Sequence, residues 1–507
     1  MTMTMTLSRR KALQTAGTMG AATVFGIGSA MATAVVPKKW TMSCDVLVVG
    51  GGAAGTFAAV SAKEAGAGKV ILIDKNPALF LNSTSYSDGY FSVSGSKFQK
   101  AAGIKDPGTK AFAQAIYKIG KNIGDPAVIK TYAEHSADAV DWLQAHGINW
   151  SFIKNPAYDF QATLSNGTGS GAVYVKILSE QAQKLGISIF LDTRATQLIT
   201  TPDGGKVLGI ACKDEDGEKF IEVKKGVVLA TGGFFGDVNL IDRYLPEHHG
   251  AITCSAPSST GDGMLMGMKI GADTCNLGYG AVYAYGVPID PAKRRGLIFR
   301  GHFAGIYGTI AVGKDGRRFV NDETGAAGVT IAAQQRGYKM VYLIATEAQI
   351  DDFMKNDPSQ VIGWNRERWL QELKENKIFC HKANTIGELA DKLGIDRKGF
   401  EAEIKKYNGF VKAGKDADYN RKNLKGTFEK GPFYGFACPR VAVLTSGGLR
   451  VSGNLEVLDV YGKPIRGLFA AGETVGGIHG ASYATGNAIG AALTLGRVAG
   501  QRAAASK

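Results

Sequence analysis

The chain has 507 residues and a formal net charge of +14, with 68 glycines and six cysteines. Its basic residues are dispersed and no recognised nucleic-acid-binding motif accompanies them, which excludes nucleic acid as the expected partner and favours an anionic substrate or an acidic protein. The cysteines form no CxxC pair, no CxxCH haem-attachment site and no zinc spacing, so we expect neither a metal nor a haem. The length exceeds that of one hydrophobic core and predicts two domains.

The first 34 residues have the pattern of an export signal. Arg9 and Arg10 precede a weakly apolar run, rich in glycine, alanine and threonine, that ends at Ala34. This pattern predicts a twin-arginine signal peptide over residues 1–34 and a periplasmic location. A short basic segment without a targeting role is the alternative. No later run reaches the ~18 apolar residues of a membrane span, so we expect no such span.

A glycine turn between two apolar strands is the most specific pattern in the chain. Gly50 would make the tight turn, Gly52 would let the backbone approach a pyrophosphate, and Gly55 would let the following helix pack closely. The second strand, over residues 70–73, ends at Asp74, where a carboxylate would accept hydrogen bonds from ribose hydroxyls. The register predicts a dinucleotide with its phosphates at the helix N-terminus. The alternative is a glycine-rich turn in an unrelated α/β domain.

The next part of the chain alternates helical and extended patterns. Apolar residues spaced three and four apart predict helices, and shorter apolar runs predict a small antiparallel insert around a turn at residues 203–205. A buried strand that starts at residue 226 stops at Thr231 and Gly232, as strands do where they meet a ligand. The predicted helices cover residues 111–119, 127–146 and 173–185, and the predicted strands of the insert cover residues 187–191, 207–213 and 219–223.

The composition changes between residues 284 and 443, which hold much of the charge and two predicted helices, over residues 366–376 and 386–393. Residues 467–473 then return to the pattern of a strand followed by glycine, so the charged stretch is predicted to be an inserted second domain. The expected division is a signal peptide over residues 1–34, a dinucleotide-binding domain over residues 35–283 and 444–507, and the inserted domain over residues 284–443.

Together these segments resemble one flavoprotein family: the soluble fumarate reductases, the flavin subunits of succinate dehydrogenase and the 3-ketosteroid dehydrogenases. The likeness is to a flavocytochrome c flavin domain without its haem domain. It implies an α/β fold (α+β overall), in which a Rossmann-like FAD-binding domain carries an inserted α+β capping domain, with FAD held non-covalently. The residues that carry the likeness are 50–74, 230–233, 260–263, 313–321 and 467–496.

The same likeness places residues around FAD. Glu473 would bind the ribityl chain or ribose, and the helix starting near Asn487 would point its N-terminus at the isoalloxazine. Asp262 would lie near the ribityl or phosphate region, and Ser83 and Thr84 beside the flavin, with loop capping as the alternative for the two hydroxyls. The residues expected to bind FAD are Gly50, Gly52, Ala54, Gly55, Asp74, Lys75, Ser83, Thr84, Gly89, Ala195, Ala230, Thr231, Gly232, Asp262, Glu473, Asn487, Ala488 and Ile489.

Four departures from the family's fumarate-type pattern argue against fumarate as the substrate. Ala326 stands where the likeness implies an acid arginine, and Tyr483 where it implies an arginine that binds a carboxylate. Gly301 and His302 stand in place of a Thr–Glu pair, and Leu444 in place of a histidine beside the flavin.

The likeness also suggests catalytic residues. Ketosteroid dehydrogenases bind a ketone with a tyrosine hydroxyl and a glycine N–H of this same turn, so Tyr483 and the N–H of Gly486 would stabilise an enolate-like transition state. A tyrosine that only packs beside the flavin is the alternative. Arg300 and His302 align with the family's active-site strand and would anchor the substrate or deliver a proton. A surface arginine and a core histidine are the alternatives.

The leading hypothesis is an exported FAD-dependent oxidoreductase that reduces an activated C=C bond. The substrate would be a small α,β-unsaturated carbonyl or carboxylate compound other than fumarate. Since the sequence has no haem or iron–sulfur motif, electrons would come from a separate periplasmic donor such as a c-type cytochrome. One alternative is a 3-ketosteroid-type dehydrogenase in which Tyr483 polarises a ketone. Another is a flavin-binding electron-transfer protein with reduced catalysis.

Overall fold

The structure is a computed structural model that describes residues 36–299, 307–356, 361 and 364–507. The expected signal peptide over residues 1–34 lies outside the described residues, as do Arg300 and His302, so what was inferred about them stays a prediction. Within the described ranges, no helix combines the length and the apolar character needed to cross a membrane.

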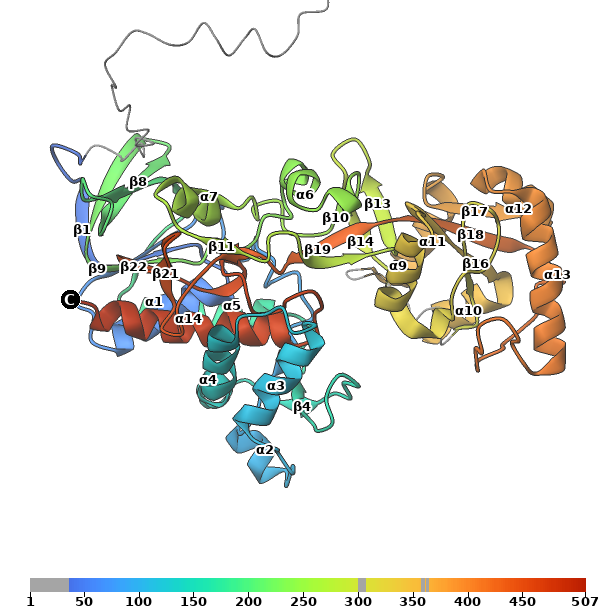
Figure 1. Cartoon of the computed structure of the whole chain (residues 1–507), viewed down its shortest axis with the longest axis horizontal. Coiled ribbons are helices and arrows are strands. Elements are labelled where there is room, and N and C mark those ends of the chain that lie inside the picture. Colours follow the sequence, from blue (N-terminus) through green and yellow to red (C-terminus); the bar gives the residue numbers. More distant parts are fainter. Residues whose placement is uncertain (1–35, 300–306, 357–360, 362–363) are drawn as a thin grey trace, which may run out of the picture.

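A central sheet, on the left of Figure 1, forms the core of the larger part of the molecule. Most of its strands are parallel, and residues 46–49 are apolar and buried because both faces of the sheet are covered. In spatial order six of its eight strands are β21 (Glu456–Leu458), β22 (Pro464–Ala470), β9 (Gly217–Leu229), β1 (Met42–Val49), β2 (Val70–Ile73) and β6 (Ser188–Phe190). The other two, β7 (Arg194–Thr200) and β8 (Val207–Asp214), join the sheet where β8 pairs with β9.

Two helices from opposite ends of the chain, α1 (Ala53–Glu64) and α14 (Asn487–Ala505), pack against each other beside this sheet (Figure 1). Their backbones approach closely because α14 places Gly496 against Ala54, where a Cβ would overlap the alanine carbonyl oxygen. The glycine turn before α1 and the C-terminal segment are therefore held in one rigid unit.

The antiparallel insert differs from the sequence expectation. The predicted turn at residues 203–205 does join two antiparallel strands, β7 (Arg194–Thr200) and β8 (Val207–Asp214). Residues 188–190, however, pair with β2 in the parallel sheet, so their assignment to the insert is wrong. The two strands predicted over 219–223 and from 226 are one strand, β9, because β1 pairs along both halves through a local bulge.

A five-stranded sheet lies between the central sheet and the lobe on the right of Figure 1. The expected domain boundaries, at residues 283/284 and 443/444, both fall within this sheet, and the division into two domains stays a prediction. In spatial order its strands are β12 (Gly280–Tyr283), β19 (Val441–Thr445), β10 (Ile252–Thr253), β14 (Arg295–Ile298) and β13 (Gly286–Asp290).

The right-hand lobe has an antiparallel sheet and an aromatic core that includes Phe299, Trp369 and Phe436. The helices predicted over residues 366–376 and 386–393 are confirmed here. The strands are β15 (Ile310–Val312), β16 (Met340–Thr346), β18 (Phe433–Pro439) and β17 (Cys380–Ala383), and the helices are α9 (Gly325–Gln335), α10 (Glu347–Asn356), α11 (Arg366–Glu375), α12 (Ile386–Leu393) and α13 (Arg397–Ala413).

The remaining elements pack around the central sheet and confirm the three helices predicted between residues 111 and 185. Helices on a largely parallel sheet, with antiparallel sheets attached, confirm the predicted α/β fold class. These elements are α2 (Lys97–Ala101), α3 (Thr109–Ile119), α4 (Pro126–Ala145), α5 (Ala172–Lys184), α6 (Val238–Tyr244), α7 (Asp262–Lys269), β3 (Phe91–Ser92), β4 (Ser151–Phe152), β5 (Thr163–Ser165), β11 (Thr274–Cys275) and β20 (Gly448–Leu449).

Candidate active site

A cavity of about 950 Å³ opens at the carboxyl ends of β1, β2, β9 and β22, the edge at which open α/β sheets bind ligands. It lies at the upper end of the size range of small-molecule sites, so it has room for a dinucleotide. Most residues that the sequence assigns to FAD line it. They are Gly50, Gly52, Ala54, Asp74, Lys75, Ser83, Thr84, Gly89, Ala195, Ala230, Thr231, Gly232, Asp262, Glu473, Ala488 and Ile489.

Two residues of the predicted set do not line the cavity. Gly55 lies in the first turn of α1, where a Cβ would overlap the carbonyl oxygen of Gly50, so it sets the helix against the glycine turn. The side-chain oxygen of Asn487 accepts a hydrogen bond of 2.5 Å from the hydroxyl of Tyr158. Both residues therefore lie behind the residues that line the cavity and hold neighbouring segments in place.

The glycine turn after β1 has the geometry of a phosphate site. Gly50 has a φ of +107°, and a Cβ there would overlap the carbonyl oxygen of Ala230, so the position requires glycine. α1 begins directly after Gly52, which has no side chain to cap it, and the N–H of Ala53 donates to Thr84 Oγ1 at 3.1 Å. The positive end of the helix dipole therefore faces the cavity, where an anionic diphosphate would be stabilised.

One carboxylate, Asp74, follows β2, and another, Asp262, is the first residue of α7. Asp74 accepts hydrogen bonds from two main-chain N–H groups, at 2.5 and 2.7 Å. Asp262 pairs with Lys75 Nζ at 3.0 Å and with Arg194 Nη2 at 3.1 Å. Burial alone would raise the pKa of Asp262, but these cations outweigh it and lower the pKa, so the carboxylate is ionised at neutral pH.

Glu473 holds three parts of the chain together. Its Oε1 accepts hydrogen bonds from the N–H of Thr445 at 2.7 Å and from the hydroxyl of the same residue at 3.1 Å. A Cβ on Gly233 would lie 2.5 Å from that oxygen. Burial raises the pKa of Glu473, and the hydrogen bonds partly offset this effect. The carboxyl group is thereby fixed where the ends of β9, β19 and β22 meet.

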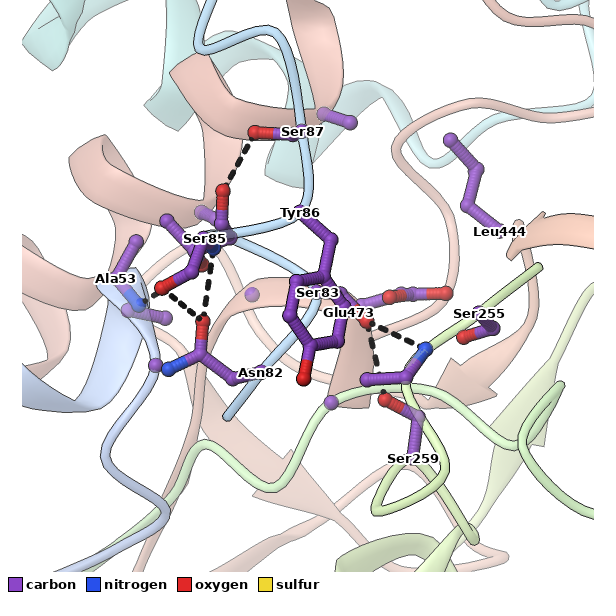
Figure 2. A pocket seen from close by; sticks show the side chains of 18 of the residues that line it. Ala53, Asn82, Ser83, Ser85, Tyr86, Ser87, Ser255, Ser259, Leu444 and Glu473 are labelled. Carbon is purple, nitrogen blue, oxygen red and sulfur yellow. Dashed lines mark hydrogen bonds between the residues drawn. The ribbon is translucent and has the colours of Figure 1, made fainter. Parts of the chain in front are cut away.

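The loop over residues 82–89 brings hydroxyl groups to the cavity. Figure 2 shows Ser83 and Tyr86 near the centre of the view, with Ser255 and Ser259 to their right. Ser83 Oγ lies 3.2 Å from Ser259 Oγ and accepts the N–H of Ala256 at 3.4 Å. These hydrogen bonds tie the loop to the segment that leads into α7.

The start of α14 is held by polar groups of the β3-β5-β4 region. The N–H of Ser92 donates to the carbonyl of Gly486 at 3.0 Å, and Ser92 Oγ and Asn155 Nδ2 donate to the carbonyl of Thr485 at 3.1 and 3.0 Å. Gly486 caps the helix with a φ of +91° and offers no side-chain acceptor. The N-terminus of α14 is thus fixed at the cavity, where it favours negative charge on a ligand.

Tyr483 and Gly486, which the sequence pairs, lie together at the cavity. Burial raises the pKa of Tyr483, and the nearby main-chain N–H of Gly486 opposes this rise. The ring of His479 packs edge to face against the Tyr483 ring, with centroids 5.4 Å apart. Because burial lowers the pKa of His479 to about 4, its imidazole is uncharged at neutral pH. Tyr483 is therefore a neutral hydroxyl group beside an uncharged imidazole.

The four departures from the fumarate-type pattern fall in different places. Leu444 lines the cavity. Ala326 lies on α9, packed against the core of the right-hand lobe, and is not among the described residues that line the cavity. Gly301 and His302 lie outside the described residues, as does Arg300.

Several polar residues that line the cavity were not predicted from the sequence, among them Ser255, Arg295 and His479. Arg295 comes from β14, and its Nη2 donates to the carbonyl of Ser255. The preceding residue, Arg294, pairs instead with Asp242, at 2.7 and 2.9 Å. Side chains alternate along a strand, so a predicted strand over residues 295–298 was the one signal that could have separated these two arginines.

FAD needs a site for its diphosphate and a site for its flavin ring. Separate parts of the chain provide these two sites in the cavity. The glycine turn and α1 suit the diphosphate, and the start of α14 suits the flavin ring, whose reduced form carries negative charge. Asp74, Asp262 and Glu473 would then hold hydroxyl groups of the ribose and ribityl parts.

Known proteins show the same architecture. A family model described as an FAD binding domain matches residues 45–489. The fumarate reductase (cytochrome) of Shewanella frigidimarina is 31% identical over 468 residues, which cover 91% of this chain and 77% of that protein. The vinyl phenol reductase of Lactiplantibacillus plantarum is 30% identical over 453 residues, which cover 86% of this chain and 90% of that protein. The solved open conformation of a flavocytochrome c3 fumarate reductase matches with a TM-score of 0.77 at 29% identity, covering 92% of this chain and 79% of that chain.

Proposed function

Because the chain belongs to the FAD binding domain family and is an FAD-dependent oxidoreductase that acts on carbon–carbon double bonds, we propose that its substrate is an α,β-unsaturated carbonyl or carboxylate compound other than fumarate. The observation that carries this proposal is the cavity wall that contains Tyr483. A neutral hydroxyl donor stands there beside the uncharged His479, and the apolar Leu444 lines the same cavity.

In the proposed reaction, Tyr483 binds the oxygen of the activating group. The main-chain N–H of Gly486 lies nearby, and the Tyr483 hydroxyl group can donate its proton to a substrate carbonyl. The hydride for the β-carbon would come from FAD in its reduced form, and the α-carbon would take a proton from a side chain or from water. Negative charge then develops on the carbonyl oxygen, and a positioned donor of this kind contributes roughly 100-fold or more to the rate.

Support for a substrate other than fumarate comes from the cavity and from one relative. The cavity wall has Tyr483 and Leu444 where the fumarate-type pattern implies a charged or basic side chain. A protein that is 30% identical to this chain is named a vinyl phenol reductase.

We further propose that the protein is exported and receives electrons from a separate periplasmic cytochrome. The proposal rests on the twin-arginine pattern over residues 1–34, on the absence of a haem-attachment motif from the sequence, and on the net positive charge. A basic protein associates faster with an acidic partner, in a salt-dependent way.

The test is a reoxidation screen. FAD-loaded protein is reduced with a viologen and mixed without oxygen with enoates, enones, aryl acrylates and fumarate, while the flavin spectrum is followed. We expect fast reoxidation by an enoate or enone, little by fumarate, and slow reoxidation in Tyr483→Phe. If no alkene reoxidises the flavin, the protein is an electron-transfer flavoprotein and the proposal fails.

One observation favours a second candidate function. Tyr483 and the N–H of Gly486 lie together, as the resemblance to ketosteroid dehydrogenases implies for residues that hold a ketone. A steroid dehydrogenase would oxidise a 3-ketosteroid with an artificial electron acceptor, and Tyr483→Phe would slow that reaction instead.

A further inference from the structure

Arg295 is an arginine of the cavity wall that the protein leaves only partly paired. It opens β14 and lies beside Thr253 of β10 in the five-stranded sheet. Its Nη2 donates to the carbonyl of Ser255, but its Nη1 is buried and has no hydrogen-bond partner within the part of the chain that the structure describes. The guanidinium of Arg295 is thus held at the cavity with an Nη1 group that no described residue accepts.

The neighbouring Arg294 forms an ion pair, so the incomplete pairing concerns Arg295 and not this whole segment. Arg294 binds both carboxylate oxygens of Asp242, at 2.7 and 2.9 Å, and also the carbonyl of Ala251. Within the described ranges no carboxylate forms an ion pair with Arg295, and the titratable groups that act on it are the thiol of Cys254 and the phenol of Tyr86. Burial raises the pKa of the Cys254 thiol to about 12, so this group is uncharged at neutral pH.

An unpaired buried cation is costly, so such groups normally pair with an anion. Burial lowers the pKa of Arg295, which is the direction expected of a guanidinium that lacks a counter-charge. Two further cavity-lining atoms, Ser255 Oγ and His479 Nδ1, are also buried without a partner in the described ranges. Each of these atoms is a place where an oxygen of a ligand can supply the missing partner.

We propose that Arg295 binds an oxyanion of a ligand in this cavity, namely the carboxylate of the unsaturated substrate. This inference rests on the proposed function and narrows its substrate class from carbonyl compounds in general to unsaturated acids. A guanidinium is suited to this role because its donors match the two oxygens of a carboxylate. The FAD diphosphate is the other possible oxyanion, but the glycine turn and the start of α1 already provide a site for it.

The experiment compares matched acids and amides on FAD-loaded protein. Acrylate against acrylamide, and cinnamate against cinnamamide, are titrated into the oxidised holoenzyme while the visible flavin spectrum reports binding. In Arg295→Gln we expect the dissociation constants of the two acids to rise roughly 10- to 100-fold and those of the amides to change less than about threefold. Arg295→Lys keeps the charge and should fall between the wild type and Arg295→Gln.

Arg440→Lys is the matched control. Arg440 is also a half-buried arginine that donates to two carbonyls, of Glu247 and Tyr338, and burial lowers its pKa as well, but it does not line the cavity. This variant should bind every probe as the wild type does. Thermal unfolding and the ratio of flavin to protein are measured for all variants, so that a folding defect is recognised.

The outcomes separate the possible sources of the oxyanion. Equal weakening of acids and amides, or no weakening of either, overturns the proposal. Loss of FAD from Arg295→Gln with unchanged acid binding in the flavin-loaded fraction assigns Arg295 to the diphosphate and also overturns it. If the wild type binds acids through Arg295 but reduces no alkene, the proposed function fails and the assignment of Arg295 stands.

Discussion

Two walls of the cavity differ in how completely the protein pairs their polar groups. The cofactor wall comprises the glycine turn with Asp74, Asp262 and Glu473, and all three carboxylates accept hydrogen bonds from the protein. The open wall comprises Ser255, Arg295, His479 and Tyr483. Its buried atoms without a partner among the described residues are Ser255 Oγ, Arg295 Nη1 and His479 Nδ1.

The difference suggests that the two walls meet different kinds of ligand. A cofactor that stays bound can be held by protein groups that the fold has already oriented, because these groups do not need to rearrange on each turnover. A substrate that comes and goes must supply the missing partners itself, and buried polar atoms without partners are the places where it can do so.

Gly50→Ala is expected to have the largest effect on the cofactor wall. A Cβ there would overlap the carbonyl oxygen of Ala230, and the φ of +107° is strained for alanine. We expect loss of most bound FAD and a decrease of at least about 2 kcal/mol in the free energy of unfolding. Flavin absorbance per protein and thermal unfolding measure both effects.

Gly409→Ala in α13 is the control, because nothing lies near the added Cβ and the helix should gain up to ~1 kcal/mol. Full flavin content in Gly50→Ala would show that the turn is not the dinucleotide site.

On the open wall, Tyr483→Phe should affect catalysis without affecting the cofactor. Removing the hydroxyl should lower kcat/KM for an enoate or enone roughly 100-fold or more, because a charge-stabilising donor is lost. The flavin content and unfolding temperature should remain those of the wild type. Tyr461→Phe, at a residue that is 83% exposed, is the control. Unchanged kcat/KM in Tyr483→Phe would place carbonyl polarisation elsewhere.

A pH series tests whether the His479 imidazole is buried in its uncharged form, with no nearby group that stabilises its protonated form. Burial lowers its pKa from 6.5 to about 4, so the unfolded chain binds a proton first as the pH falls. Stability should therefore decrease from about pH 6.5 towards pH 4, by roughly 3 kcal/mol for this one group. His479→Gln should flatten the profile of unfolding temperature against pH.

His248, whose pKa burial also lowers to about 4, lies outside the cavity lining, so His248→Gln gives the same flattening without affecting ligand binding. Parallel wild-type and His479→Gln profiles would contradict the burial of an uncharged imidazole.

The smallest effect is expected on the cofactor wall, in Asp262→Asn. The lowered pKa of Asp262 means that its ion pairs stabilise the fold above the unfolded pKa near 4 and are lost as the pH falls through the folded pKa. We expect a loss of about 1 kcal/mol at neutral pH, and profiles that converge in acid. Asp203→Asn, on the exposed turn between β7 and β8, should leave FAD binding unchanged. A neutral-pH effect of Asp262→Asn that persists in acid would exclude the ion pairs as its cause.

The cofactor wall was predictable because its signals are local in the sequence. Gly50, Gly52 and Gly55 lie within one turn and one helix start, and Asp74 follows the next strand. The roles of Gly55 and Asn487 were less accessible, because contact with the cavity depends on which side of a helix start faces it. For Asn487 that orientation is fixed by Tyr158, which is far away in the sequence.

Few local sequence patterns predicted the residues of the open wall. Ser255, Arg295 and His479 come from three distant segments and have no spacing in common. Arg295 reaches the cavity because β14 pairs with β10 in the register Thr253 to Arg295. Tyr483 was found only through the resemblance to a known family.

The sequence by itself determined the dinucleotide turn, because steric rules for glycine and apolar periodicity act over short stretches of chain, while the fold class and FAD as the cofactor followed from its resemblance to a known family. Only the tertiary structure decided that residues 188–190 join the parallel sheet, that β9 is one strand, and that Arg295 rather than Arg294 enters the cavity. Those choices depend on backbone pairing and on the burial of charge between segments that are distant in sequence, which no local pattern records.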